Sequence, residues 1–221
     1  MGPALNIITN QNTDQQQANM THGAYRIAHQ DDEFLEHDDQ RGARLMMEYQ
    51  KTESALLRSN IETTLVVFGG ARILSPEQSS AALQAAKTPE EKYMAELRAK
   101  QVPWYEMARE FGRIVSLRGG ALPQAAGDSL RNVIATGGGP GLMEAANRGA
   151  HEVGAPSIGF NITLEHEQAP NPYSNPELTF LFKYFGIRKM QMALRASGLA
   201  VMPGGLGTMD ELYDKAAMSF K

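Results

Sequence analysis

The stretch TTLVVFGG, residues Thr63–Gly70, is the segment that decides the fold. Its β-branched and apolar residues form a short continuous run that ends in two glycines, which is the pattern of a central parallel strand entering a loop. The run NVIATGGG, residues 132–139, has the same form. Three further runs are strand candidates: PSIGFNI at 156–162, LTFLFKYF at 178–185 and GLAVM at 198–202.

Segments with helical spacing of apolar residues alternate with these strands. They lie at about 103–117, 141–154, 186–197 and 208–220. Strands that alternate with helices imply right-handed crossovers, and these place the strands parallel in one sheet. The sequence therefore predicts an α/β fold: a doubly wound, Rossmann-like parallel sheet with helices on both faces.

The amino-terminal part of the chain has a different composition. Residues 1–36 are rich in Gln, Asn, Asp and His and contain few branched apolar residues, so we expect a partly disordered arm. Residues 37–60 carry apolar side chains at helical spacing among charges, which predicts an amphipathic helix. The nucleotide-binding α/β domain is then expected over residues 61–221.

Composition and charge exclude several classes of partner. The net charge of −4 provides no concentrated basic surface, so we expect no nucleic-acid partner. The chain has no cysteine, which excludes disulfides and thiolate metal sites. It also lacks a signal-peptide pattern and any run of about 18 apolar residues, so a cytoplasmic protein without a membrane partner is expected.

Three glycine-rich loops follow predicted strands: FGGAR at 68–72, TGGGPG at 136–141 and PGGLGT at 203–208. In open parallel sheets, ligands bind outside the carboxyl ends of the strands. Glycine lets a phosphate approach the backbone, and a following helix presents free N–H groups and the positive end of its dipole. One such loop can serve only as a tight connection, so the prediction of a phosphate site depends on all three.

Two familiar nucleotide motifs are absent. Counted from Gly137, the dinucleotide fingerprint requires glycine at the sixth position, where this chain has Leu142, and no G-x-x-x-x-G-K-[ST] sequence occurs. A Rossmann dehydrogenase and a P-loop NTPase are therefore not supported.

The segment RKMQMALRASGLAVMPGGLGTMDE, Arg188–Glu211, resembles the paired signature of the LOG family of phosphoribohydrolases. That signature is an Arg-Lys dipeptide followed by P-G-G-x-G-T-x-x-E. The stretches GGGPGLMEAANRGA and EQAPNPY are similar to longer bacterial members, some of which carry the labels nucleotide nucleosidase or lysine decarboxylase. The resemblance spans residues 63–221. It implies cleavage of a nucleoside 5′-monophosphate, AMP or a cytokinin riboside monophosphate, into free base and ribose 5-phosphate without a metal or organic cofactor.

Cleavage of an N-glycosidic bond builds positive charge on the ribose, which requires a nearby carboxylate. The resemblance makes Glu211 that carboxylate and Arg188 the second catalytic residue, which orients the substrate and Glu211. Taken without the resemblance, Glu211 could equally be an acid facing a helix dipole, and Arg188 an ordinary solvated base. The expected substrate-binding residues are Gly138, Gly139, Gly141, Met143, Glu167, Lys189, Gly204, Gly205, Gly207, Thr208 and Asp210. The histidines show no zinc-ligand spacing, so no metal site is expected.

Two features depart from the LOG pattern. Relatives often carry serine where this chain has Gly70, so one hydroxyl contact to the ligand is missing. The family normally continues beyond the position of Lys221 with another strand and helix, so we expect the carboxyl-terminal unit of the domain to be missing.

Other functions remain open at this stage. One is a non-catalytic nucleotide or molybdopterin carrier on the same fold, and another is an interaction subunit whose partner binds the arm and the helix at 37–60. A pyridoxal-dependent lysine decarboxylase is disfavoured, because no lysine lies in a context that indicates such a site. Family members pair through helices that flank the site, so a homodimer is expected.

Overall fold

The computed structural model describes residues 13–164, 169–205 and 207–209. By its internal contacts the chain divides into two compact units, Met1–Met47 and Glu48–Lys221. Within the described residues, the helices are too short or too polar to cross a membrane.

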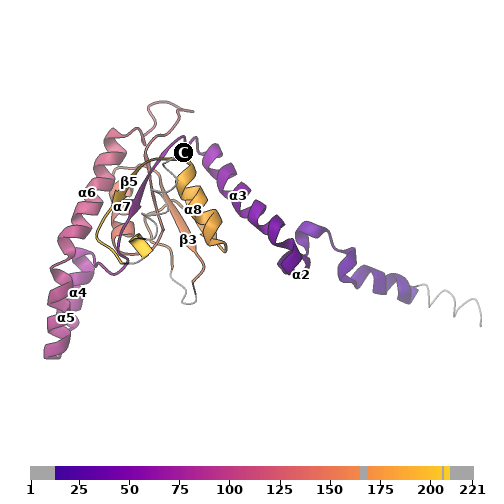
Figure 1. The fold of residues 1–221 in the computed structure, drawn as a ribbon, viewed down its shortest axis with the longest axis horizontal. Helices are drawn as coiled ribbons and strands as arrows, with labels where there is room; N and C mark the ends of the chain where they lie inside the picture. Colours follow the sequence, from indigo (N-terminus) through magenta and orange to yellow (C-terminus); the bar gives the residue numbers. More distant parts are fainter. Residues whose placement is uncertain (1–12, 165–168, 206, 210–221) are drawn as a thin grey trace, which may run out of the picture. The chain divides into compact units, whose positions relative to one another are not determined.

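The second unit is built on a five-stranded sheet in the order β4-β3-β2-β1-β5 (Figure 1). Every neighbouring pair of strands is parallel, so all the carboxyl ends lie at one edge. The strands are β1 Thr64–Phe68, β2 Val133–Thr136, β3 Ser157–Ile162, β4 Thr179–Phe182 and β5 Ala196–Val201. The predicted α/β fold with a parallel sheet is confirmed.

Helices flank this sheet, with α6 and α7 packed together against β2 and α8 packed against β3 and β4 (Figure 1). The helices of this part of the chain are α4 Pro76–Ala85, α5 Pro89–Ala99, α6 Val102–Arg118, α7 Leu142–Glu152 and α8 Phe185–Leu194. Capping boxes begin α4 and α5: Ser75 pairs with Gln78, and Thr88 pairs with Glu91. Each box satisfies backbone N–H groups that the first helical turn leaves free.

The core lies between the strands and these helices. All four residues of β2 are buried, which explains why its sequence is an uninterrupted apolar run rather than an alternating one. Phe160 of β3 contacts the rings of Phe180 and Phe182 of β4, at centroid distances of 5.9 and 6.1 Å. These aromatic contacts join the edge strand to the rest of the sheet.

Helices α6 and α7 cross at backbone contact. A Cβ atom on Gly112 would collide with the carbonyl oxygen of Ala146, and one on Gly149 would collide with the carbonyl oxygen of Arg109. Two glycines therefore allow the two helices to approach more closely than side chains would permit.

An ionic cluster links the surfaces of α4, α6 and α7. The Arg148 guanidinium lies 2.9 Å from the Glu77 carboxylate and 3.1 Å from that of Glu152, which also lies 2.7 Å from Arg109. The hydrogen bonds from Arg148, and then from Ser75, lower the pKa of Glu77 to about 2.

The first unit consists of short helical segments. Residues 13–21 are helical and are followed by η1 Gly23–Tyr25, η2 Ala28–Gln30, α2 Asp32–Glu36 and η3 Asp38–Gln40. Composition predicts partial disorder over residues 1–36; the described residues 13–36 include helical turns, of which η1 is capped by the His22 side chain and α2 by the Asp31 side chain. Helix α3, Arg41–Arg58, lies within the range 37–60 where an amphipathic helix was expected.

We expect Gly149→Ala to lower the free energy of unfolding by about 1–3 kcal/mol, because the new methyl group meets backbone atoms of α6 that have no room to move. Urea unfolding monitored by circular dichroism measures the change. The control is Gly42→Ala in α3, where a Cβ meets nothing within 4 Å and helix propensity predicts a gain of up to about 1 kcal/mol. Equal stability of Gly149→Ala and the wild type would contradict the close crossing.

The lowered pKa of Glu77 predicts a pH dependence. Its folded-state pKa of about 2 lies below the ordinary glutamate value of 4.5, so the ionised carboxylate contributes stability that is present above about pH 4.5 and lost as the pH falls toward 2. We expect Glu77→Gln to remove this contribution, so that stability falls less steeply with acidification than in the wild type. Urea titrations across this pH range give the two slopes, and identical slopes would argue against the ion pair.

Candidate active site

The three glycine loops meet at the carboxyl edge of the sheet. The backbone N–H of Gly70, in the first loop, donates to the carbonyl oxygen of Pro203 in the third loop at 3.0 Å. The carbonyl oxygen of Gly70 accepts from the N–H of Leu142, just after the second loop, at 3.1 Å. The backbone of Gly70 is thus hydrogen-bonded to both of the other loop regions.

Glycine residues, which have no side chain, make this close approach of the loops possible. Gly141 has a φ of +74°, and a Cβ atom there would collide with the Gly70 carbonyl oxygen. A Cβ atom on Gly70 would lie 3.2 Å from the Pro203 carbonyl oxygen, which is tighter than ordinary van der Waals contact. The glycine that replaces the serine of relatives therefore fits the close approach of the first and third loops.

A buried network of polar side chains holds the second loop. The Thr136 hydroxyl donates to Asn147 Oδ1 at 2.7 Å and accepts from the Gly138 N–H at 3.0 Å. Asn171 Nδ2 donates to Asn147 Oδ1 at 3.0 Å and to the Gly139 carbonyl oxygen at 3.2 Å. Asn171 also donates its backbone N–H to the Gly138 carbonyl oxygen. The backbone of the loop is therefore fixed from both sides.

Sequence reasoning did not single out the residues of this network. Asn147 lies within α7 and Asn171 within the stretch EQAPNPY, and both side chains are buried. An uncharged amide on the apolar side of a helix, as at Asn147, is the signal that could have found it, because buried polar groups need partners.

Arg188 lies against the second loop. It stands in the first turn of α8, is only 5% exposed, and donates from Nε to the Phe160 carbonyl oxygen at 2.7 Å. A Cβ atom on Gly137 would lie 2.6 Å from the Arg188 Nη2 and 2.9 Å from the Met143 sulfur. The structure therefore brings together Arg188, Met143 and the beginning of the TGGGPG loop.

Lys189, the neighbour of Arg188, lies partly buried on the same helix. Its Nζ is 4.6 Å from the centroid of the Phe185 ring, and the Arg188 Cζ is 5.7 Å from the same centroid. The face of one aromatic ring thus accommodates two cations at the beginning of α8.

The third loop leads into a helix, since residues 207–209 are helical. The Thr208 N–H donates to the Gly205 carbonyl oxygen at 3.1 Å, and the Thr208 side chain packs against Gly204. A Cβ atom on Gly205 or Gly207 would meet nothing within 4 Å. These two glycines therefore border open space beside the helical residues 207–209.

Three of the expected site residues, Glu167, Asp210 and Glu211, lie outside the described residues. Their expected roles in catalysis and substrate binding stay predictions.

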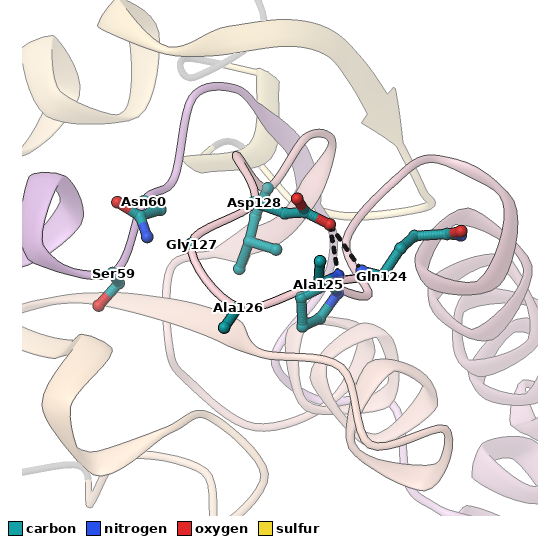
Figure 2. A pocket seen from close by; sticks show the side chains of 9 residues that line it. Ser59, Asn60, Gln124, Ala125, Ala126, Gly127 and Asp128 are labelled. Atoms are coloured by element: carbon teal, nitrogen blue, oxygen red, sulfur yellow. Dashed lines mark hydrogen bonds between the residues drawn. The ribbon is translucent and has the colours of Figure 1, made fainter.

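A pocket of about 420 Å³ lies elsewhere in the same unit (Figure 2). Asn60 and Leu130, which line it, precede β1 and β2, so the pocket lies at the amino edge of the sheet, away from the glycine loops. The Asp128 carboxylate accepts the backbone N–H groups of Gln124 and Ala125 there. That carboxylate stabilises its own loop. Because the pocket lies at the opposite edge of the sheet from the glycine loops, it is not the candidate active site.

The fold and the edge of the sheet define the class of protein: a doubly wound α/β protein whose three glycine loops and buried arginine meet at the carboxyl ends of the strands. Residues 143–219 match the family described as "Possible lysine decarboxylase", to which the LOG proteins belong. This match confirms the resemblance to the LOG family over the part of the chain that contains Arg188 and the PGGLGT loop.

The crystal structure of TM1055, a structural genomics target, is similar to this chain. It is 22% identical, the alignment covers 71% of this chain and 69% of TM1055, and the TM-score is 0.45. No curated protein matches the chain.

We expect Asn171→Ala to lower the free energy of unfolding by about 1–3 kcal/mol, because the Gly139 carbonyl oxygen loses a side-chain donor and Asn147 Oδ1 loses one of its two donors. Chemical denaturation measures the loss. Asn19→Ala is the matched control, since the hydrogen bond between Asn19 and Gln15 is exposed and should contribute little. A loss no larger than that of the control would show that the network does not stabilise the second loop.

Proposed function

We propose that this protein hydrolyses the N-glycosidic bond of a purine nucleoside 5′-monophosphate, AMP or a cytokinin riboside 5′-monophosphate, to give the free base and D-ribose 5-phosphate. The observation that carries the proposal is the position of Arg188. Its buried guanidinium lies against the second of three glycine loops that are hydrogen-bonded together. The family match supports a protein of the phosphoribohydrolase type.

The third loop is our proposed site for the 5′-phosphate. Gly205 and Gly207 border open space beside the helical residues 207–209, and the positive end of a helix dipole favours an anion there. Gly204 and Thr208 shape the turn. The second loop, at Gly138, Gly139 and Gly141, is the proposed contact surface for the rest of the nucleotide.

The reaction breaks the bond between C1′ of the ribose and the ring nitrogen of the base. The bonding electron pair and a proton go to the base, and the oxygen of a water molecule bonds to C1′. Positive charge develops on the ribose during this step, so a carboxylate close to C1′ lowers the barrier by stabilising that charge or by deprotonating the water. We assign this role to Glu211 from its place in the LOG signature, with Asp210 and Glu167 as proposed neighbours.

Arg188 has the complementary role in this proposal. A guanidinium already fixed by its Nε bond to Phe160 can present its other N–H groups to substrate oxygens or to a carboxylate in a planar arrangement. Burial in a partly closed site strengthens such contacts. Arg188 would thus orient both the substrate and Glu211, while Lys189 adds positive charge for the nucleotide phosphate.

The test is incubation of the purified chain with AMP and chromatographic measurement of adenine. We expect the wild type to release adenine, and Arg188→Lys and Glu211→Gln to lower kcat by about 100-fold or more, because each removes a group that acts in the transition state. Glu177→Gln, which replaces an acid at the amino end of β4, is the matched control and should retain wild-type kcat.

The remaining outcomes separate the rival functions. A folded wild type that binds AMP without releasing adenine is a nucleotide carrier. Absorbance from bound pyridoxal in the purified protein would instead support lysine decarboxylation.

A further inference from the structure

The helix that carries Arg188 lacks an amino-terminal cap of its own. The N-cap residue of α8, Tyr184, makes no side-chain capping bond, and the first turn contains no acidic residue. This turn instead contains Gly186 and the cation Arg188, and the cation Lys189 follows it. Glycine weakens a helix, and cations near its amino end are unfavourable next to the dipole. The first turn of α8 therefore needs an acceptor from elsewhere in the chain.

Glu48, on α3, provides that acceptor. Its Oε1 accepts the backbone N–H of Lys183 at 2.7 Å, and its Oε2 accepts the N–H of Tyr184 at 3.3 Å. Both oxygens of one carboxylate thus bond the two residues that lead into α8. The negative charge also lies at the positive end of the helix dipole, where it is stabilising.

Other contacts between the same two helices lie farther along α8. The amide of Gln191, only 1% exposed, donates to the Tyr49 carbonyl oxygen at 3.2 Å. Arg195, which ends α8, donates to the Glu53 carboxylate at 2.6 Å. Residues of α3 therefore bond to both ends of α8, and Glu48 bonds to the end that carries Arg188.

We propose that Glu48 is a positioning residue for Arg188: by capping α8 it fixes the turn that places the guanidinium against the second glycine loop. Arg188 donates its own backbone N–H to the carbonyl oxygen of Tyr184, one of the two residues that Glu48 binds. Loss of the cap frees this turn and lets the side chain leave the Phe160 carbonyl oxygen. A loss of catalytic activity on removal of the cap rests on the proposed function. The loss of the hydrogen bond from Arg188 to Phe160 does not rest on it.

The same contact restricts where the substrate phosphate can bind. The amino terminus of α8 already holds a carboxylate of the protein, and a second anion there would be repelled. The third loop and the beginning of α7 remain as phosphate sites. Residue 48 lies outside the segment 143–219 that matches the family, so a part of the chain beyond the matched segment becomes necessary for full activity.

The test compares Glu48→Ala with Glu53→Ala in the full chain. Both variants remove a carboxylate of α3 that bonds to α8, one at each end of that helix. The first readout is kcat and KM for AMP. We expect Glu48→Ala to lower kcat by about 10- to 100-fold, as a misplaced catalytic group does, and Glu53→Ala to stay within about threefold of the wild type.

The second readout is independent of activity: hydrogen exchange of the Arg188 Nε–H, followed by nuclear magnetic resonance. Exchange should be at least about tenfold faster in Glu48→Ala than in the wild type and unchanged in Glu53→Ala, because local opening sets the rate. Glu48→Gln keeps one carbonyl acceptor, so we expect it to restore most of both readouts. If the alanine variant fails to fold, Glu48→Ser replaces it, because the shorter side chain does not reach the N–H groups of Lys183 and Tyr184.

The outcomes separate the two proposals. If the wild type releases no adenine but Arg188 exchange rises only when Glu48 is changed, the proposed function fails and the positioning role stands. If the wild type is active and Glu48→Ala matches Glu53→Ala in both kcat and exchange, the positioning role is overturned and the proposed function stands.

Discussion

The candidate site depends on one short piece of backbone, the peptide groups of Gly70. One hydrogen bond from this residue and one to it connect three loops that are far apart in the sequence. The connection is possible because β1 lies between β2 and β5 in the sheet, so the loop that leaves β1 is flanked by the other two. It also requires the absence of side chains, since a Cβ atom at Gly69 or Gly141 would collide with the neighbouring loop.

The polar network under the second loop and the capping of α8 both supply hydrogen-bond partners to backbone groups that would otherwise lack them. Loops and helix ends leave backbone N–H and carbonyl groups without partners, and burying such groups is costly unless side chains satisfy them. Asn147 and Asn171 satisfy the loop, and Glu48 satisfies the helix end. The expected catalytic chemistry therefore takes place on a frame that is already hydrogen-bonded before any ligand arrives, which lowers the ordering cost of binding.

The sequence predicted the parts of this structure that have a local signal. The buried strands appear as apolar runs, the loops as glycine clusters, and the position of Arg188 as part of a family motif. Long-range pairs have no such signal: Asn147 and Asn171 are 24 positions apart, and Glu48 and Lys183 are 135 positions apart. The helical turns of residues 13–36 were missed because composition does not reveal that His22 and Asp31 cap them.

The position of β1 also determines when the site can form as the chain is synthesised. β1 pairs with β5, whose residues follow about 130 positions later, so a ribosome adding about 5–20 residues per second needs roughly 7 to 26 seconds to supply this partner. Until then β1 has an open apolar edge that can pair with another nascent chain. The third loop emerges after β5, so the proposed phosphate site forms after the other two glycine loops.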